Sequence, residues 1–557
     1  MPRPNLGNSG GLHHSLDLAF QAGLMDINTP VRICIPICKR RLDALKLAIR
    51  QSSVEADAIE LRLDCLEPSE LDRLIESGEL AARIGPPRIL TLRPVEQGGR
   101  RDLDYASRYE FWRRRFQSTG QYFMDMELDM IEGLISATDP SVSSIDWTRI
   151  IASHHDFKGL PIDLERIYGR LIRSPARILK LAVQAGDVTD CIPVFGLLDR
   201  ARAENREMIA IAMGAAGVAT RILGPSRGAF LTYGAIDSDR ATAPDQISAT
   251  DLKHLYRIHK INRETQILGL TGLPVGHSIS PHIQNAAFAA AEFDGVYIPF
   301  EVRDVASFIK RMIHPRTREI DWNLRGLSVT APHKAAVMDY LDWIDDAAKE
   351  IGAVNTIVVE AEVLRGYNTD GAAFIDTLVQ KTGELRDARC AIIGAGGAAS
   401  AALWGLSRNQ ARVTIFARDV EKARVLAERF GVEWVALSSA SFEGFDVVIN
   451  ATTLGTVGKL EGETPAHAAQ LRGARLAYDL VYNPQETQFL LEARDAGIEV
   501  FGGLPMLLAQ AAWQFRLWTG LDAPGKEMEN AAIEALTGDH DPLNCPKTHE
   551  QNAARVN

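Results

Sequence analysis

The sequence lacks the marks of a membrane protein, a nucleic-acid-binding protein and a disordered protein. It has no apolar run of the roughly 18 residues that a membrane-spanning helix needs. Acidic residues outnumber lysine and arginine by 72 to 61, and the formal net charge of -11 argues against binding to a phosphate backbone. Repeats and low-complexity segments are missing, and 46% of the residues are hydrophobic. A globular protein that acts on small molecules is expected.

Cysteine is also scarce. The six cysteines are scattered, and the close pair Cys34 and Cys38 has no second pair to match it. Neither a zinc site nor a disulfide framework is therefore expected. The first 30 residues hold no apolar stretch long enough for a secretory signal and are interpreted as a tail. These features predict a metal-free protein in the reducing cytoplasm.

The first half of the chain contains a regular series of short apolar runs. A chain of 557 residues exceeds what one hydrophobic core usually organises, so two or three domains are expected. From Val31 onward, runs rich in Ile, Leu and Val alternate with polar, helix-like stretches. The runs are 32–37, 58–63, 88–92, 121–126, 149–152, 177–182, 208–213 and 229–233. Eight strand–helix units predict a (β/α)8 TIM barrel, which places its chemistry at the carboxyl ends of the strands.

The second half predicts a different α/β architecture. The barrel pattern stops near Ala243, and a Gly-rich turn at Gly394 follows the predicted strand 389–393. Strands and helices then alternate, which indicates a doubly wound, Rossmann-like fold. The expected parts are a tail (1–30), the barrel (31–250), a basic linker helix (251–264), an α/β substrate domain (265–372), a dinucleotide-binding domain (373–503), C-terminal helices that return to the substrate domain (504–538) and a polar tail (539–557).

Lys180 is the most unusual residue of the first half, because apolar residues flank it inside a predicted strand. Burial disfavours the ammonium form, and the free amine can condense with a ketone to form a Schiff base. A lysine that reaches solvent from a strand end is the alternative. His155 ends the preceding strand and would lie beside Lys180 as a general base. Arg62, Arg93 and Arg221, placed at other strand ends, suit a carboxylate-bearing substrate.

Five strings of the first half point to a family. They are Glu60-Leu61-Arg62-Leu63-Asp64, Thr91-Leu92-Arg93-Pro94, Ser153-His154-His155-Asp156-Phe157, Lys180-Leu181-Ala182 and Ala243-Pro244-Asp245-Gln246. Residues 31 to about 250 thereby resemble type I 3-dehydroquinate dehydratase. The resemblance implies a Schiff base on Lys180, proton removal by His155 and formation of 3-dehydroshikimate. It also implies substrate contacts from Glu60, Arg62, Arg93, Arg221, Thr242 and Gln246. Where this family commonly has a glutamate that orients the histidine, the chain has Gln97.

A phosphate-binding turn is indicated by the G-x-G-x-x-A string at 394–399, between a predicted strand and a predicted helix. Its predicted cofactor-binding residues are Gly394, Ala395, Gly396, Gly397 and Ala398. The next strand ends at Arg418, which together with Lys422 suits the 2′-phosphate of NADP. Asp419 supports NAD as the alternative, because an acid at this position would bind the ribose. NADP is the predicted cofactor.

Lys334 and Asp370 form the predicted catalytic pair of the second half. Lys334 lies in the first turn of an expected proline-started helix, where its charge opposes the helix dipole unless it has a function. Asp370, in the string 366–371, is a plausible partner. Such a pair can move a proton to or from an alcohol oxygen while hydride moves at the adjacent carbon. An ion pair at a helix end is the alternative.

A second resemblance, over residues 265 to about 530, is to shikimate dehydrogenase. Its strings are Gly276-His277-Ser278-Ile279-Ser280-Pro281, Val329-Thr330-Ala331-Pro332-His333-Lys334, Gly352-Ala353-Val354-Asn355-Thr356, Tyr367-Asn368-Thr369-Asp370-Gly371, Asn450-Ala451-Thr452, 478–484 and Leu508-Ala509-Gln510. The resemblance implies substrate contacts from Ser278, Ser280, Thr330, Asn355, Tyr482 and Gln510, and cofactor contacts from Asn450 and Thr452. Ser328 replaces an asparagine of many stand-alone members and resembles the fused plant-type enzymes.

Together the two resemblances predict a bifunctional enzyme of the shikimate pathway, which leads to aromatic amino acids. It would convert 3-dehydroquinate to 3-dehydroshikimate and then, with NADPH, to shikimate. One alternative is a second half that oxidises quinate with NAD. Another is a non-catalytic sensor, since the same two domain types resemble parts of a fungal quinate-pathway repressor. A sensor should have lost Lys180, His155, Lys334 or Asp370, and all four remain.

Overall fold

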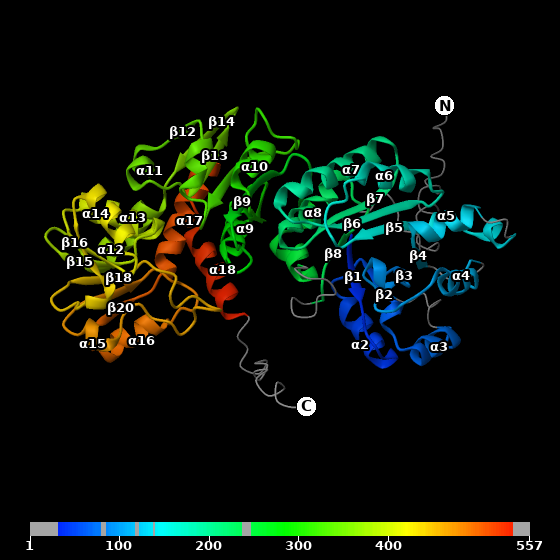
Figure 1. Cartoon of the computed structure of the whole chain (residues 1–557), viewed down its shortest axis with the longest axis horizontal. Coiled ribbons are helices and arrows are strands. Elements are labelled where there is room, and N and C mark those ends of the chain that lie inside the picture. The colour runs from blue at the N-terminus through cyan, green and yellow to red at the C-terminus, as the bar shows by residue number, and fades with distance from the viewer. Residues whose placement is uncertain (1–31, 79–84, 117–121, 137–139, 237–246, 539–557) are drawn as a thin grey trace, which may run out of the picture. The chain divides into compact units, whose positions relative to one another are not determined.

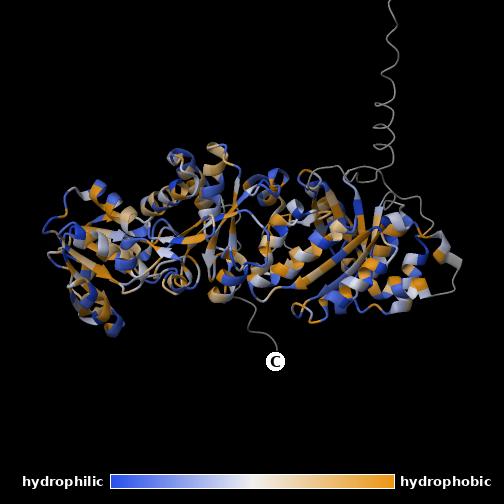
Figure 2. Ribbon diagram, turned by 90° about the horizontal axis from the view of Figure 1, so that it is seen from above, coloured by the Kyte–Doolittle hydropathy of each residue, from blue (hydrophilic) through white to orange (hydrophobic). Residues whose placement is uncertain are grey.

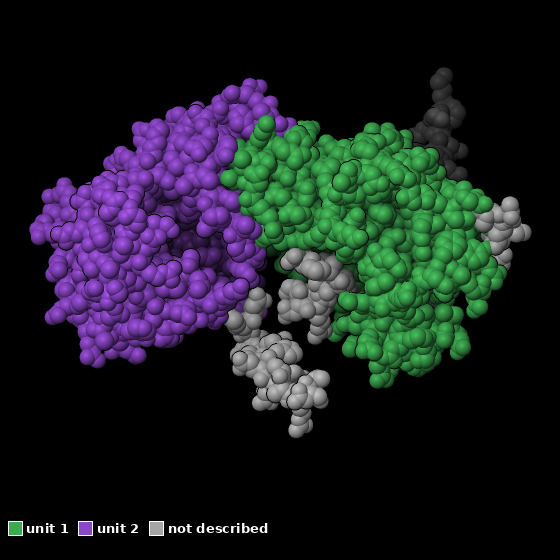
Figure 3. Space-filling view, in the orientation of Figure 1, with its two compact units in different colours: residues 1–265, 298–312, 319–323 green, residues 266–297, 313–318, 324–557 purple. Residues whose placement is uncertain are grey.

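The computed structural model describes residues 32–78, 85–116, 122–136, 140–236 and 247–538. The chain forms two compact units (Figures 1 and 3). The first contains residues up to Thr265 with the stretches 298–312 and 319–323, and the second contains the remainder. Among the helices of these ranges, none is long and apolar enough to cross a membrane.

A parallel barrel forms the first unit. Its strands are β1 (Ile33–Ile37), β2 (Ala58–Arg62), β3 (Arg88–Thr91), β4 (Tyr122–Glu127), β5 (Ile150–Asp156), β6 (Ile178–Gln184), β7 (Glu207–Met213) and β8 (Thr232–Tyr233). They follow the order β7-β6-β5-β4-β3-β2-β1-β8. A parallel bridge between Met208 and Ala229, at the entry to β8, links the two ends. The predicted strands and the barrel are confirmed.

Helices cover the barrel strands: α2 (Leu42–Ser52), α3 (Pro68–Glu76), α4 (Tyr105–Arg113), α5 (Leu128–Ser136), α6 (Leu164–Arg173), α7 (Cys191–Ala203) and α8 (Val218–Leu223). In α6, Leu164, Ile167, Tyr168 and Leu171 are buried at helical spacing. Most residues of the strands are apolar, because both faces of a parallel barrel strand are buried. Figure 2 shows this difference, with hydrophobic colour gathered in the strands and mixed colour on the helices.

The expected linker helix is not a single helix, which corrects the prediction for 251–264. A π-helical turn covers Asp251–Leu255, and a separate 3-10 turn covers Ile258–Lys260. Arg257 between them has a left-handed backbone with a φ of 50°. An α-helix cannot continue through a residue in that conformation, and sequence periodicity does not reveal it.

The second unit begins with a mixed sheet. Its strands are β9 (Gln266–Gly272), β10 (Gly295–Glu301), β11 (Leu324–Val329), β12 (Trp343–Ile344), β13 (Thr356–Glu360) and β14 (Val363–Tyr367), in the order β10-β9-β11-β13-β14-β12. The connecting helices are α9 (Ser280–Ala290) and α11 (Asp346–Ile351), while α10 (Val305–Phe308) and the end of β10 lie in the stretch 298–312 of the first unit. The C-terminal helices α17 (Leu504–Thr519) and α18 (Gly525–Thr537) pack on α9. They are two helices, separated after the left-handed Gly520, in the stretch for which C-terminal helices were expected.

A parallel sheet completes the second unit. Its strands are β15 (Arg389–Ile393), β16 (Arg412–Ala417), β17 (Glu433–Ala436), β18 (Val447–Asn450), β19 (Leu476–Asp479) and β20 (Glu499–Phe501). Helices α12 (Asp370–Thr382), α13 (Gly397–Arg408), α14 (Val420–Phe430), α15 (Ala468–Leu471) and α16 (Gln488–Asp495) belong to the same region. The order β17-β16-β15-β18-β19-β20 is that of a dinucleotide-binding fold, with its switch point between β15 and β18. The predicted doubly wound fold is confirmed.

Candidate active sites

Lys180 lies in the middle of β6 and exposes 4% of its surface, so its predicted burial is confirmed. Its Nζ lies 2.8 Å from Oδ2 of Asp125, 2.7 Å from the hydroxyl of Tyr233 and 3.4 Å from Oε2 of Glu60. The two carboxylates compensate the charge of the buried ammonium group. Burial alone, which was the argument from the sequence, is therefore an incomplete description of this lysine.

His155 faces the same interior as Lys180. In the register of β5 and β6, Ser153 pairs with Lys180 and His155 pairs with Ala182, so both functional side chains point into the barrel. Nδ1 of His155 is buried and, among the described residues, has no hydrogen-bond partner. Gln97 contacts the backbone of His155, whose N–H donates to Oε1 at 3.2 Å, and not its ring.

The surroundings of His155 favour its neutral form. Burial, followed by the positive charges of Arg93 and Lys180, lowers the pKa of His155 well below its usual value. A neutral imidazole is the form that can accept a proton. The base therefore stays active when the pH falls below the usual histidine pKa of about 6.5.

This protonation state predicts a pH profile. We expect the kcat/KM for dehydration of 3-dehydroquinate to stay constant as the pH falls through 6.5. Because the pKa of His155 is lowered, the loss of activity that follows its protonation should occur at a lower pH. Gln97→Glu would put a carboxylate beside His155, raise its pKa and move the limb upward. Initial rates from pH 5 to 9 measure both, with Gln97→Met as the uncharged control. A wild-type limb near 6.5, unmoved in Gln97→Glu, contradicts the prediction.

The three predicted arginines differ in how the fold places them. Arg93 is 2% exposed and forms ion pairs with Asp125 at 2.8 Å and Glu127 at 3.3 Å. Arg62 donates to both carboxylate oxygens of Asp64, each at 2.9 Å. Arg62 and Arg93 both lie at the carboxyl ends of barrel strands, as predicted, and both pair with acidic residues there. Their side chains supply the positive charge that a carboxylate-bearing substrate needs.

Arg221 is not at a strand end, which corrects the prediction. It lies in α8, and its Nη1 donates to the carbonyl oxygen of Tyr233 at 3.4 Å. All six residues of α8 are buried, so this short helix has no polar face by which the sequence could reveal it. The helix still brings Arg221 to the strand that carries Tyr233. Thr242 and Gln246 lie outside the described residues.

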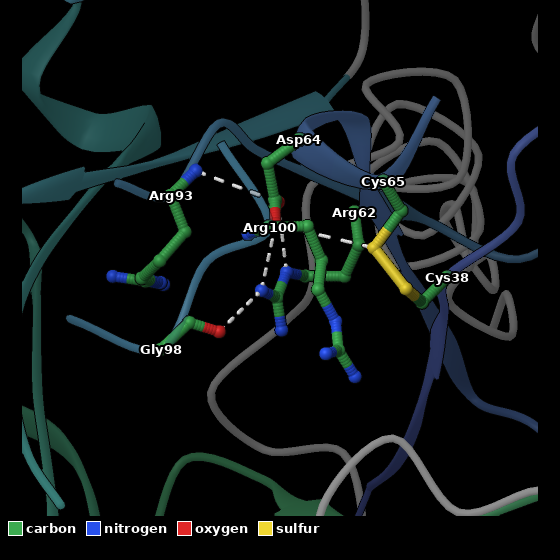
Figure 4. Close-up of a disulfide and its surroundings, with 7 residues drawn as sticks. All are labelled: Cys38, Arg62, Asp64, Cys65, Arg93, Gly98 and Arg100. Carbon is green, nitrogen blue, oxygen red and sulfur yellow. Dashed lines mark hydrogen bonds and ion pairs between the residues drawn. A yellow bond between two sulfur atoms is a disulfide. The ribbon is translucent and has the colours of Figure 1, made fainter. Parts of the chain in front are cut away.

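A disulfide joins Cys38 to Cys65, where none was expected (Figure 4). Cys38 follows β1 and Cys65 follows β2, and these strands pair in parallel, so their ends meet although the cysteines are 27 residues apart. Asp64, the residue before Cys65, accepts from Arg62 and from the backbone N–H of Arg100 at 3.0 Å. The disulfide thus lies next to the carboxylate that orients Arg62.

Lys334 and Asp370 contact each other as predicted, with 2.5 Å between Nζ and Oδ2. Asp370 is the first residue of α12. Lys334, however, is not in a helix. A turn follows β11, and the next helical residues, a 3-10 turn, start at Ala336. The helix-dipole argument for Lys334 therefore fails, and its function rests on the contact with Asp370.

Asn355 orients this pair. Its side-chain N–H groups donate to Oδ1 of Asp370 at 2.7 Å and to Thr369 at 2.9 Å. Behind it, Gln514 donates to the carbonyl oxygen of Asn355 at 3.3 Å and accepts from Ser328 at 2.8 Å. Both hydrogen-bonding ends of the buried Gln514 are thereby used. Ser328, noted in the sequence as a plant-type feature, is part of this support.

The other predicted substrate residues belong to the second unit. Ser278 donates to Ser280 at 3.1 Å, and Ser280 opens α9. The hydroxyl of Tyr482 hydrogen-bonds to Ser278, while burial raises its pKa. Thr330 follows β11, next to Gly272. Gln510, in α17, donates to the carbonyl oxygen of Leu507 at 2.9 Å.

The predicted phosphate turn lies at the switch point of the parallel sheet. Gly394 directly follows β15 and has a φ of 120°, and a Cβ there would meet the carbonyl oxygen of Ala451 at 3.0 Å. Only glycine fits such a position. Asn450 ends the neighbouring β18 and accepts from the backbone N–H and the hydroxyl of Thr452 at 3.0 and 2.7 Å. The turn and the start of α13 are thus shaped to hold a pyrophosphate.

Asp419 has a structural role at the edge where the ribose would bind. It is the N-cap of α14 and accepts from the backbone N–H of Lys422 at 3.2 Å. Its other oxygen lies 3.4 Å from Nζ of the same lysine. Arg418 is exposed beside it. An aspartate that caps its own helix is less available to a ribose, which favours a role for Arg418 with a 2′-phosphate.

Arg418 therefore predicts the cofactor preference. We expect Arg418→Ala to lower the kcat/KM for NADP about 10- to 100-fold, the loss of a hydrogen bond between charged groups, and to leave NAD nearly unchanged. Shikimate oxidation with each cofactor measures this. Arg424→Ala, which removes an exposed arginine of the following helix α14, is the matched control. An equal loss with both cofactors contradicts a phosphate-specific role.

The sequence motifs did not predict three residues of the barrel site: Asp125, Glu127 and Tyr233. Asp125 and Glu127 could have been recognised, because acidic residues at alternating positions of a fully buried strand, Tyr122–Glu127, are unusual. No feature of the sequence indicated a role for Tyr233, since an aromatic residue in a strand usually belongs to the core. Among the described residues, no group of three or more His, Cys, Asp or Glu could hold a metal ion.

Fold and sites define a class: a lysine-centred barrel enzyme joined to a dehydrogenase with a dinucleotide fold. Within this class, the chain belongs to the bifunctional 3-dehydroquinate dehydratase/shikimate dehydrogenase family. The enzyme of that name from Arabidopsis thaliana, described as chloroplastic, is 32% identical over 89% of this chain and 83% of its own length.

Family models match successive segments of the chain. They are type I 3-dehydroquinase (33–263), the shikimate dehydrogenase substrate binding domain (270–357), shikimate / quinate 5-dehydrogenase (377–470) and the shikimate 5'-dehydrogenase C-terminal domain (503–533). The shikimate dehydrogenase (NADP(+)) of Oleidesulfovibrio alaskensis is 40% identical over 49% of this chain and 96% of its own. A solved Thermus thermophilus shikimate 5-dehydrogenase, in complex with NADP(H) and shikimate, is 33% identical over 49% of this chain and all of its own, with a TM-score of 0.44.

Proposed function

We propose that this chain dehydrates 3-dehydroquinate to 3-dehydroshikimate and then reduces that product to shikimate with NADPH. The observation that carries the proposal is the presence of two complete reactive centres in one chain. Lys180 is buried among carboxylates in the barrel, and Lys334 contacts Asp370 in the second unit. Burying the charge of Lys180 costs free energy, and a catalytic function would explain why that cost is retained.

The barrel residues perform the dehydration. Nζ of Lys180 attacks the ketone carbon, and loss of one water leaves an imine. Neutral His155 removes a proton from the neighbouring carbon and returns it to the departing hydroxyl, which leaves as water. Hydrolysis of the imine then releases 3-dehydroshikimate and restores the lysine. Arg62, Arg93 and Arg221 bind the carboxylate and hydroxyls of the substrate.

The residues of the second unit position and protonate the ketone. NADPH, when bound along the Gly394 turn and the start of α13, supplies a hydride. Lys334 gives a proton to the substrate oxygen and is reprotonated from solvent, while the carboxylate of Asp370 holds its ammonium group in place. Ser278 and Ser280 bind the substrate carboxylate, while Thr330, Asn355, Tyr482 and Gln510 hold its hydroxyls.

Oxidation of quinate with NAD is the second candidate for this unit. Asp419 is the residue that favours it, but its cap on α14 supports the NADP assignment instead. A cytoplasmic location stays a prediction, since the plant relative is described as chloroplastic. Disulfides such as Cys38–Cys65 are also rare in reducing compartments such as the cytoplasm.

One coupled assay tests the proposal. The purified chain is given 3-dehydroquinate and NADPH, and we expect one NADPH to be consumed for each shikimate formed. Paired oxidation assays with shikimate and quinate, each with NADP and NAD, test the second candidate. Faster turnover of quinate with NAD would reverse our preference.

A further inference from the structure

Tyr233, like Asp125, contacts Lys180 Nζ although no motif assigned it. Its ring lies among the buried barrel residues, and its hydroxyl reaches the nucleophilic nitrogen at 2.7 Å. An ammonium group has three N–H donors. The three oxygens around Nζ, from Asp125, Glu60 and Tyr233, match these donors in number.

The phenol of Tyr233 both accepts and donates. Its oxygen accepts from Lys180, which leaves its own proton free to be donated, and its side chain is hydrogen-bonded to Glu60. Burial and the charge of Glu60 raise the pKa of Tyr233 well above its usual value, so the phenol keeps its proton. A protonated hydroxyl between an ammonium and a carboxylate has the arrangement of a proton relay.

We propose that Tyr233 is a further catalytic residue of the dehydratase, which relays a proton from Lys180 to Glu60 and so frees the amine. This inference rests on the proposed Schiff-base function. One N–H bond of Lys180 breaks as an O–H bond forms on Tyr233. The original phenol proton passes to Glu60, whose carboxylate becomes a carboxylic acid. The tyrosine ends as it began, and Lys180 keeps the electron pair that attacks the ketone.

Asp125 is a poorer acceptor for this proton. Although burial alone would raise its pKa, Arg93 and Lys180 hold the pKa of Asp125 far below its usual range. Its ion pair with Arg93 at 2.8 Å also persists when Lys180 becomes neutral. Glu60 pairs with Lys180 at 3.4 Å, and that pair disappears with the charge of the lysine. Although burial alone would raise its pKa, Lys180, Arg62 and Arg93 lower the pKa of Glu60, and the largest of these positive contributions is lost with the charge of Lys180. Protonation then removes a buried negative charge that has lost its ion-pair partner.

Tyr233→Phe tests the relay, because it removes the hydroxyl and keeps the ring. The full chain is mixed with 3-dehydroquinate, quenched with borohydride at set times and analysed by mass spectrometry for the adduct on Lys180. We expect imine formation to slow about 100-fold, the usual size of a proton-transfer contribution. We also expect it to become faster with rising pH, since solvent must now deprotonate the lysine. Tyr256→Phe, which removes another buried tyrosine hydroxyl of this unit, is the matched control.

A second variant keeps the proposal testable if Tyr233→Phe does not fold. Glu60→Gln should show the same slow, pH-dependent imine formation, and the double variant should be no slower than the slower single one, because one relay can be lost only once. Imine formation within about two-fold of wild type at every pH in Tyr233→Phe, or additive losses in the double variant, overturns the relay. Absence of an adduct in the wild type instead overturns the Schiff-base function itself.

Discussion

Replacing Lys180 by methionine should abolish the dehydratase activity of the chain and leave its oxidation of shikimate unchanged. The substitution removes the nucleophile, and loss of a nucleophile commonly costs about 10⁴-fold or more in kcat. The product 3-dehydroshikimate, a conjugated ketone, is followed by its ultraviolet absorbance. Borohydride reduction in the presence of 3-dehydroquinate should label the wild-type chain at Lys180 and leave the variant unlabelled.

Stability must be separated from chemistry in this variant. Methionine leaves Asp125 and Glu60 buried without the cation, and removing one partner of a buried ion pair costs about 3 to 5 kcal/mol. Lys180→Arg keeps a cation and is the second variant, with a smaller expected loss of stability and the same loss of activity. Dehydration that persists in a folded Lys180→Arg chain would refute a covalent role for the lysine.

Asp370→Asn should reduce the kcat of shikimate oxidation about 10²- to 10⁴-fold, the range of general acid–base catalysis, with a smaller change in KM. The amide keeps the size of the carboxylate but lacks the negative charge that holds the ammonium group of Lys334, which Asp370 contacts at 2.5 Å. Initial rates with varied shikimate separate the two parameters. The dehydratase activity of the same preparation should be unchanged.

The matched control is Asp346→Asn, which neutralises an exposed aspartate also paired with a lysine. We expect wild-type rates from it. A lowered affinity for shikimate in Asp370→Asn with an unchanged kcat would make Asp370 a binding group rather than part of the proton-transfer pair.

The barrel strands and Lys180 are predictable from the sequence for one physical reason. A strand of a parallel barrel is buried on both faces, so it appears as an unbroken apolar run, and a lysine inside such a run stands out. The partners of Lys180 are not predictable in this way. Asp125 and Tyr233 are 55 and 53 positions away, and only the closure of the barrel brings them to Nζ.

The wrong predictions depend on local backbone or on strand order. Single residues in unusual conformations, such as Arg257, end a helix that periodicity would continue. The bond between Cys38 and Cys65 follows from the pairing of β1 with β2, which cysteine spacing does not encode. The roles of Thr242 and Gln246 stay predictions, since both lie outside the described residues.

The cap that Asp419 forms on α14 has an evolutionary consequence. Serine, threonine and asparagine cap helices nearly as well as aspartate, so the charge at this position can change while the helix remains stable. Cofactor preference at the neighbouring Arg418 can thus drift through single substitutions that stability does not oppose. A lineage of this enzyme could move between the two nicotinamide cofactors without passing through a misfolded ancestor.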